Sequence, residues 1–263
     1  MMLLRSITKH VTEQNWFAVF IDFLIVVVGV FIGIQVANWN ETRQQQSLTA
    51  HYLQRITDDL EANILDAEQR VVYFSQTRSH GLAALSALSA LGEPSEPSEP
   101  LGKQFIIDVY QASQALPRQF DNESYAEVNS IGAQVAIADV DIRMRLSTYF
   151  RSIQASVNNL TTIMPYRESI RSIMPYQAQK AVRDNCDDVM GVNQYFQHII
   201  TLPTSCEINL SRKDVDTAVK AILDAAIQDE LTRQVSDLDT KLSSLQIFKD
   251  RTTLMIDYLR GLD

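Results

Sequence analysis

The sequence predicts an all-α protein, in which one N-terminal transmembrane helix continues into a long amphipathic helix, with an antiparallel helical stalk and a helical head domain. Three observations predict this class. An apolar run of 24 residues lies near the N-terminus. Apolar residues then recur every three or four positions in two long stretches, one after residue 41 and one after residue 230. The 263-residue chain has only eight glycines and almost none of the period-two alternation of strands.

The apolar run is the predicted transmembrane helix, residues 16–39. At ~1.5 Å per residue such a helix is about 36 Å long, which matches a hydrocarbon core of about 30 Å and its edges. Trp16 and Trp39 stand at its two ends, where indole rings prefer the headgroup boundary. A cleaved signal peptide is the alternative, but the run is longer than the usual apolar core of such peptides. No small-x-small cleavage site lies between the intact apolar run and a polar mature start. We therefore expect a retained anchor.

The direction of insertion follows from what the anchor carries. Two basic residues precede the run and two follow it closely, so the positive-inside rule alone does not choose a direction. An N-terminal signal-anchor translocates the chain that follows it, and here the large following domain contains both cysteines. We expect a single-pass protein of the inner (cytoplasmic) membrane, with a short cytoplasmic N-terminus at 1–15 and a periplasmic domain at 40–263.

Small and polar residues interrupt the apolar run. Gly29, Gly33 and Ala37 recur every fourth position, which lets a second helix approach closely. Asp22 lies about two turns earlier, near the same face. An ionised aspartate costs about 2.5 to 3.5 kcal/mol at the centre of a membrane helix, so Asp22 is either tolerated near the cytoplasmic boundary or faces a polar partner. Gln35 lies toward the far boundary, where hydrogen bonds between helices explain it.

Two amphipathic stretches predict the stalk. The first covers about 41–91 and continues the membrane helix, and the second covers about 230–260 with nearly heptad spacing that suits antiparallel packing. The segment GEPSEPSEP at 92–100 contains three prolines and predicts an exposed loop. About 101–212 forms the expected head. The apolar positions are Leu48, Tyr52, Ile56, Leu60, Ile64, Ala67, Val71 and Phe74 in the first stretch, and Leu231, Val235, Leu238, Leu242, Leu245, Phe248, Met255 and Leu259 in the second.

Cys186 and Cys206 are the only cysteines, which are too few and too far apart for a zinc site of the CxxC type. A disulfide is their expected use in a periplasmic domain, and on the chain-entropy model it would stabilise the fold by roughly 3 kcal/mol. Two unpaired buried cysteines in a reducing compartment are the alternative.

The end of the apolar run reads GVFIGIQVANWNE. It resembles the signature of a family of uncharacterised bacterial single-pass membrane proteins, whose anchor ends in a pattern close to GILIALQINNWNE. That family has an acidic residue seven positions before the first glycine, where this chain has Asp22, while Gly33 and Ala37 replace the usual alanine and asparagine. The resemblance implies a fold type and a location but no activity. The residues that match its end are Asn38, Trp39, Asn40 and Glu41.

A second segment, 121–150, is similar to a part of the same family in which a Tyr-x-Glu-Leu-x-Ser-x-Gly run precedes a short turn and another helix. Tyr125, Glu127, Ser130 and Gly132 take those places here, with valine in place of the leucine. The rest of the chain matches the family only loosely.

No catalytic constellation is visible in the sequence. The four histidines stand alone, and there is no HExxH, GxSxG, phosphate-binding glycine loop or GxGxxG. The acidic cluster at 184–188 lacks the ligand spacing of a calcium loop. The formal net charge of −9 argues against a nucleic-acid partner. We expect a non-enzymatic protein with no cofactor and no metal.

Two functional hypotheses follow. The first is a membrane-anchored helical scaffold or sensor-like interaction protein of unknown ligand, which self-associates in the lipid bilayer as a homo-oligomer. The second is an accessory subunit of an ion-coupled membrane complex, in which Asp22 faces a multi-span partner. Its architecture is broadly similar to that of the small subunits of proton-driven bacterial motors. The long helix after Trp39 and the lack of a recognisable peptidoglycan-binding motif weaken the second hypothesis.

Overall fold

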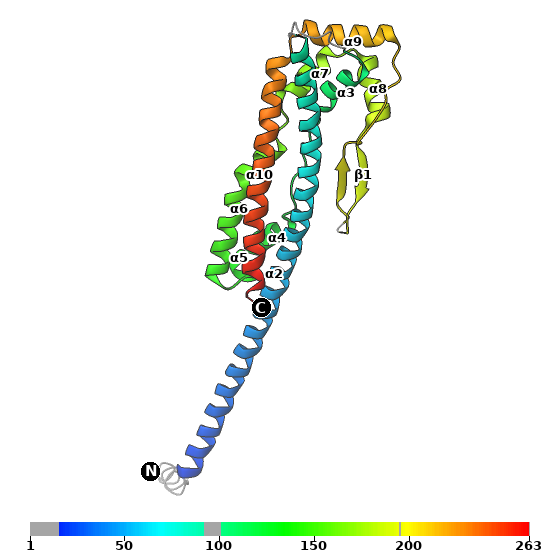
Figure 1. Cartoon of the computed structure of the whole chain (residues 1–263). Helices are drawn as coiled ribbons and strands as arrows, with labels where there is room; N and C mark the ends of the chain where they lie inside the picture. The colour runs from blue at the N-terminus through cyan, green and yellow to red at the C-terminus, as the bar shows by residue number, and fades with distance from the viewer. Residues whose placement is uncertain (1–15, 92–100, 195, 263) are drawn as a thin grey trace, which may run out of the picture.

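The computed structural model describes residues 16–91, 101–194 and 196–262. The expected cytoplasmic segment at 1–15 and the proline-rich loop at 92–100 lie outside these residues. The described part is helical apart from one two-stranded sheet, so the predicted all-α class is confirmed. Figure 1 shows an elongated molecule in which one long helix leads from the N-terminal end into a bundle.

The predicted membrane helix and the first stalk helix form a single helix, α2 (Trp16–Ala90). Its 75 residues contain no proline, so no backbone donor is missing along its length. Every side chain described from Phe17 to Gln44 is exposed. By length and composition α2 is the one helix in the described residues that could cross a membrane, and none of its apolar window is buried within the chain.

The second stalk helix, α10 (Gln228–Arg260), packs antiparallel against α2. Three ion pairs mark the register of the two helices: Arg78 with Asp239 at 2.5 Å, Lys249 with Glu68 at 3.2 Å, and Arg260 with Glu61 at 2.6 Å. These pairs are partly exposed, so the buried apolar stripe between the helices supplies most of the stability.

Two hydrophobic clusters divide the segment expected as one head. The first surrounds the stalk and takes in α4 (Glu123–Ile131), α5 (Ala133–Ala136) and α6 (Val140–Thr161). The second lies at the far end of the stalk and contains the remaining helices. Only that end is a separate head, because α6 is long enough to bury its apolar stripe along α10. The head helices are α3 (Lys103–Gln111), α7 (Pro165–Ile173), α8 (Tyr176–Cys186) and α9 (Arg212–Asp224).

A β-hairpin interrupts the helical head, which was expected to contain no strands. Strand β1 (Val189–Val192) pairs antiparallel with β2 (His198–Thr201), and Val189 lies opposite Thr201. Four-residue strands are too short to show a clear alternation in the sequence. Cys186 and Cys206 are joined by a disulfide across 5.4 Å between their Cα atoms, which closes the segment that contains the hairpin.

Candidate functional site

A stripe of polar side chains runs along α2 beside its apolar stripe. The members recur every three or four residues, so they share one helix face. Each binds a segment outside α2. We call this stripe the polar seam, and it consists of Asp59, Asn63, Asp66, Arg70, Tyr73, Gln76 and His80.

An ion cluster forms the centre of the polar seam. Nε and Nη2 of Arg70 donate to Oδ2 of Asp66 at 2.9 and 2.6 Å, and Arg118 donates to the other carboxylate oxygen. The side chain of Arg70 is 0% exposed and that of Asp66 is 4% exposed. Burial lowers the pKa of Arg70, because water no longer solvates its charge. Asp66 therefore compensates a buried cation, with Arg118 as a second, partly exposed one.

The two arginines use their other donors to hold backbone. Arg70 donates Nη1 to the carbonyl of Arg118 at 2.7 Å and Nη2 to that of Gln119 at 3.2 Å. Arg118 donates Nη1 to the carbonyl of His198 in β2 at 2.6 Å. The ring of Phe120 lies 4.0 Å from the guanidinium of Arg70 and stacks at 4.0 Å on Phe248 of α10. One cluster thus joins α2, α10, β2 and the connection before α4.

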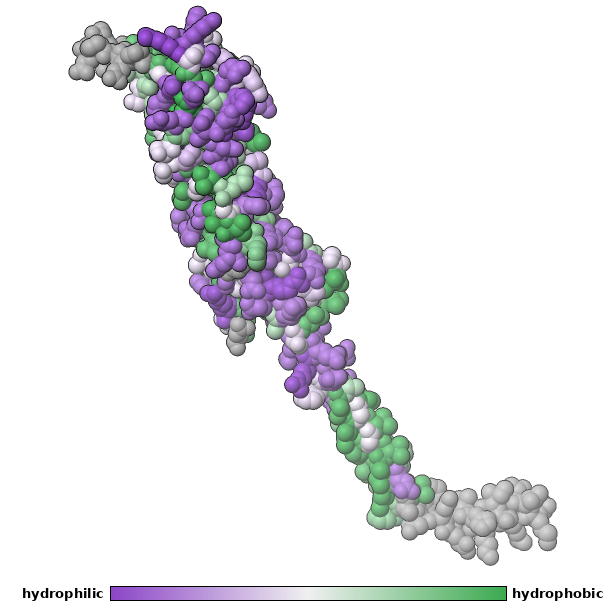
Figure 2. All heavy atoms as spheres, turned by 90° about the vertical axis from the view of Figure 1, so that its right-hand side faces the viewer, coloured by the Kyte–Doolittle hydropathy of each residue, from purple (hydrophilic) through white to green (hydrophobic). Residues whose placement is uncertain are grey.

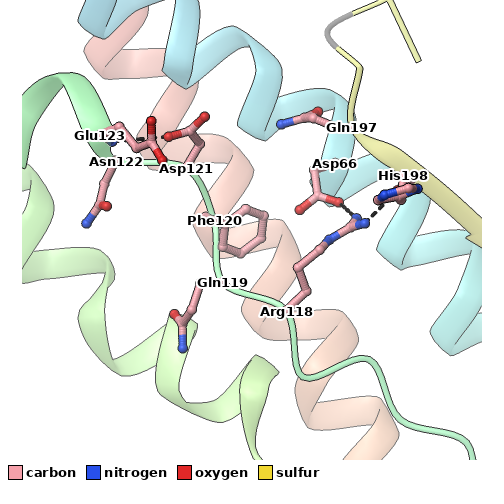
Figure 3. Close-up of a pocket in the computed structure, with 9 residues that line it drawn as sticks. All are labelled: Asp66, Arg118, Gln119, Phe120, Asp121, Asn122, Glu123, Gln197 and His198. Carbon is pink, nitrogen blue, oxygen red and sulfur yellow. Dashed lines mark hydrogen bonds and ion pairs between the residues drawn. The ribbon is translucent and has the colours of Figure 1, made fainter. Parts of the chain in front are cut away.

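A cavity of about 400 Å³ opens beside this cluster. Figure 3 shows Arg118 reaching both Asp66 and His198, while Gln119 points away from them. Asp66 and Arg118 bind each other, and the other ionisable side chains of the cavity wall are Asp121, Glu123 and His198. No group of His, Cys, Asp and Glu side chains suited to a metal ion occurs in the part of the chain that the structure describes. The cavity walls are Asp66, Arg118, Gln119, Phe120, Asp121, Asn122, Glu123, Gln197 and His198.

Two amides of the polar seam bind backbone as a neighbouring strand would. Asn63 donates to the carbonyl of Asp121 at 2.6 Å and accepts from its N–H at 2.8 Å. Gln76 donates to the carbonyl of Leu202 at 2.8 Å and accepts from its N–H at 3.0 Å. Each amide satisfies both polar groups of an irregular segment that lies against the helix.

The ends of the polar seam hold α4 and α3. Asp59 accepts from the backbone N–H of Ser124 at 3.0 Å, and burial raises the pKa of this carboxyl. Nδ1 of His80 lies 2.7 Å from Oδ1 of Asp108 in α3. Between them the Tyr73 hydroxyl lies 3.5 Å from Asp188, in the acidic cluster after α8. Asp188 is partly buried, which raises the pKa of its carboxyl, whereas Asp184 and Asp187 of the same cluster are exposed.

The predicted residues of the second family segment attach α4 to its neighbours. Glu127 pairs with Arg55 at 2.7 Å and accepts from the Tyr52 hydroxyl at 3.0 Å, and these two contacts, Arg55 first, lower its pKa. The ring of Tyr125 stacks on Phe150 of α6 at 3.9 Å.

A tight turn completes this segment. Ser130 donates its hydroxyl to the carbonyl of Glu127 at 2.8 Å at the end of α4. Gly132 separates α4 from α5 with a φ of 95°, which L side chains rarely adopt. These four residues therefore have structural roles in fixing the corner between α4 and α6.

The predicted residues of the membrane span are packed against no other described part of the chain. Asp22, Gly29, Gly33, Gln35 and Ala37 are all exposed on α2. A Cβ added at either glycine would meet nothing within 4 Å. Asp22 precedes Gly29 by seven positions and shares its face, whereas Gln35 lies two positions after Gly33, roughly 200° around the helix. The structure thus separates Gln35 from the small-residue face.

The end of the span is exposed as well. Trp39 is 64% exposed, and the guanidinium of Arg43 lies 5.7 Å from its ring centre. The carbonyl of Asn38 accepts from the Thr42 hydroxyl at 2.9 Å within the helix. Trp16 is the first residue of α2, and its side chain lies outside the described residues. Asn40 and Glu41 are exposed.

A buried lysine was not predicted from the sequence. Nζ of Lys241 donates to the carbonyls of Asn159, Leu160 and Thr162, at 2.8, 3.1 and 2.7 Å, at the C-terminal end of α6. Carbonyls at the end of a helix have no N–H partner within it, so Lys241 donates the hydrogen bonds that a further helical turn would have made. Burial lowers the pKa of Lys241 to about 8.

The polar seam was also missed, although a signal for it exists. The apolar stripe of α2 was followed by its spacing, and the polar residues of the seam repeat with the same spacing, shifted around the helix. A regular polar stripe usually indicates a solvated face. The burial of its centre depends on the connection at 112–122 and on β2. No local sequence pattern predicts that these two segments pack against α2.

Comparisons of this chain with protein-family models, with curated proteins and with solved structures found no match. The resemblance of the anchor to a family of single-pass membrane proteins therefore stays a prediction.

Proposed function

We propose that this protein is a non-enzymatic, membrane-anchored helical scaffold that self-associates through its membrane span. One observation carries the proposal: none of the apolar window of α2 is buried within the chain, whereas the later part of the same helix packs against α10, α3 and α4. Among the described residues, the one buried side-chain polar atom without a partner is Oε1 of Gln234. Nearly all buried side-chain polar atoms of the described body are thus paired within the chain, whereas an apolar span requires lipid or another helix around it.

The small-residue face supports the homo-oligomer. Figure 2 shows a pale band along the apolar surface of this part of α2. Gly29 and Gly33 are not required by packing inside the chain, because an added Cβ would meet open space at both. Glycines at these two positions would instead allow the backbone of a second helix to approach closely.

We place the anchor in the inner membrane, with residues 1–15 in the cytoplasm and the helical body in the periplasm. The disulfide between Cys186 and Cys206 supports this orientation, because such bonds persist in oxidising compartments. Labelling of thiols in whole cells tests it. A membrane-impermeant maleimide should label Cys206, which is partly exposed, only after a reductant is added, and labelling that requires cell lysis would place the body in the cytoplasm.

Asp22 supports a second candidate function, as an accessory subunit of an ion-coupled complex. Its carboxylate is exposed on the span, where an unpaired charge is costly in lipid. A multi-span partner with a polar cavity would relieve that cost. Under this alternative, Asp22→Asn should abolish a proton-coupled phenotype of the intact complex, and full function in that variant would exclude it.

The experiment that tests the proposed function is extraction of the tagged full chain in a mild detergent, followed by the mass of the complex and identification of copurifying proteins. We expect a homo-oligomer containing only this chain. A monomer, or a multi-span protein recovered in fixed ratio, would contradict self-association, and the second result would support the ion-coupled alternative.

A further inference from the structure

An uncharged corner lies at the membrane-facing end of the helical body. Residues 131–138, IGAQVAIA, contain no charged side chain, although 21% of the whole chain is charged. The corner buries Ala136 and Ile137 completely, but leaves Ile131 and Val135 at 43 and 52% exposed, and Val140, which follows Asp139 at the start of α6, is 56% exposed. We call these three exposed side chains the foot. Figure 1 shows α5 and the start of α6 at the end of the bundle from which α2 continues alone.

The foot has a fixed height above the membrane span. Gln45 of α2 donates to the carbonyl of Val135 at 2.7 Å, and Thr49 donates to that of Ala136 at 3.0 Å. Gln45 follows Trp39 by six residues in the same unbroken helix, a rise of about 9 Å at ~1.5 Å per residue. The headgroup layer on each side of the hydrocarbon core is roughly 5 to 7 Å thick. Side chains of the foot that extend toward the membrane are therefore within reach of this layer.

We propose that the foot inserts into the interfacial layer of the membrane that α2 spans, so that the body has two membrane contacts. The partner is the boundary between lipid headgroups and acyl chains. This inference rests on the proposed anchor. A contact away from the axis of α2 determines the tilt and rotation of the body, because a single span sets neither.

The charges beside the foot favour apolar insertion over electrostatic attraction. Oδ1 of Asp139 accepts from the N–H groups of Asp141 and Ile142 at the start of α6. Arg143 donates to the carbonyls of Ile137 and Ala138 at 2.6 and 2.7 Å. These charges are engaged with backbone, and Asp139 and Asp141 are balanced in number by Arg143 and Arg145. Neutral lipid should therefore be sufficient.

Site-directed spin labelling of the full chain tests the inference. The native cysteines are bonded to each other, so a single introduced cysteine takes the nitroxide. Val135→Cys reports on the foot, Leu82→Cys on a similarly exposed position of the head end of α2, and Val28→Cys on the span. Collision rates with oxygen, which concentrates in lipid, and with a water-soluble nickel chelate are compared in phosphatidylcholine vesicles.

We expect the ratio of oxygen to nickel collisions at position 135 to lie between those at positions 28 and 82, and Val140→Cys to behave in the same way. A value at 135 equal to that at 82, with 28 in lipid, would overturn the foot and leave the anchor intact. An aqueous value at 28 would overturn the anchor itself. Protection at 135 that needs added phosphatidylglycerol would show electrostatic attraction and contradict apolar insertion.

Discussion

The two parts of α2 differ in what covers them, although they belong to one continuous helix. From Phe17 to Gln44 every described side chain is exposed and most are apolar. From Tyr52 to Ala84 the helix buries an apolar stripe and, beside it, the centre of the polar seam from Asn63 to Tyr73. In the first part, the apolar side chains are not buried against the described chain. In the second part, the charged side chains of Asp66 and Arg70 are shielded from water.

This difference shows that burial in the chain and hydrophobicity are separate properties. The exposed part offers small and branched side chains, which under the proposed function pack against lipid and against other helices. The covered part can bury Arg70 and Asp66 because each compensates the other. Damage to the covered part should reduce stability, and damage to the exposed part should reduce association. The following variants test this separation.

The largest loss of stability is expected from Arg70→Met. The change leaves Asp66 buried with Arg118 alone and leaves two backbone carbonyls without their donor, so the free energy of unfolding should fall by about 3–5 kcal/mol. Urea denaturation of the full chain in mild detergent, followed by circular dichroism, measures it. Arg151→Met is the matched control, since Arg151 is exposed, and should change stability by less than about 0.5 kcal/mol.

The double variant Asp66→Leu/Arg70→Met sharpens the test. It removes both buried charges, and Arg118 is exposed enough to find water. We expect it to be more stable than Arg70→Met alone. A double variant that is less stable by the sum of both single losses would show that the charges do not compensate each other.

A smaller effect is expected from the disulfide at the far end of the covered part. Cys186→Ser/Cys206→Ser opens the loop of 20 residues that holds the hairpin, which should cost about 3 kcal/mol on the chain-entropy model. Thermal unfolding of the variant and of the oxidised protein gives the difference. An unchanged midpoint would mean that the hairpin and α9 are held by packing alone.

Association, not stability, should respond to Gly33→Ile. A branched side chain on the small-residue face keeps a second helix away, and we expect a loss of roughly 1–2 kcal/mol of helix association, or about tenfold in the dissociation constant. Energy transfer between labelled chains in vesicles measures it. Val28→Ile, on the opposite face, is the control. A fall in the urea midpoint of Gly33→Ile would contradict the separation of the two parts.

An effect of similar size is expected from the pH dependence of Lys241. Burial lowers its pKa to about 8 from a usual value near 10.5, so the folded state disfavours the charged amine. The resulting loss of stability is fully present below pH 8, and it is relieved as pH rises from about 8 toward 10.5, because the unfolded chain then binds more protons.

Stability of the unaltered protein should therefore rise by about 1–2 kcal/mol between pH 8 and 9.5. Lys241→Met should lack this rise. Urea midpoints at half-unit steps of pH check the difference between the two. A parallel pH profile for both proteins would show that another group titrates.

Much of the fold was readable in the sequence because local periodicity determined it. The spacing of the apolar residues from Leu48 to Phe74 predicted a long helix, and the spacing from Leu231 to Leu259 predicted its antiparallel neighbour. The candidate site was less accessible. Arg70 and Lys241 look like ordinary solvated residues in the sequence. An i,i+4 pair such as Asp66 and Arg70 is common on exposed helix faces, and the backbone carbonyls that Arg70 and Lys241 also bind come from segments about 50 or 80 positions away.

By itself the sequence determined the helical class and an apolar stretch long enough to span a membrane, because both depend on residues that are neighbours along one helix. Only the tertiary structure decided that α6 lies on the stalk, that a hairpin interrupts the head and that the centre of a regular polar stripe is buried. Those features depend on long-range contacts, in which a charge is stable out of water only when a distant segment supplies its partner.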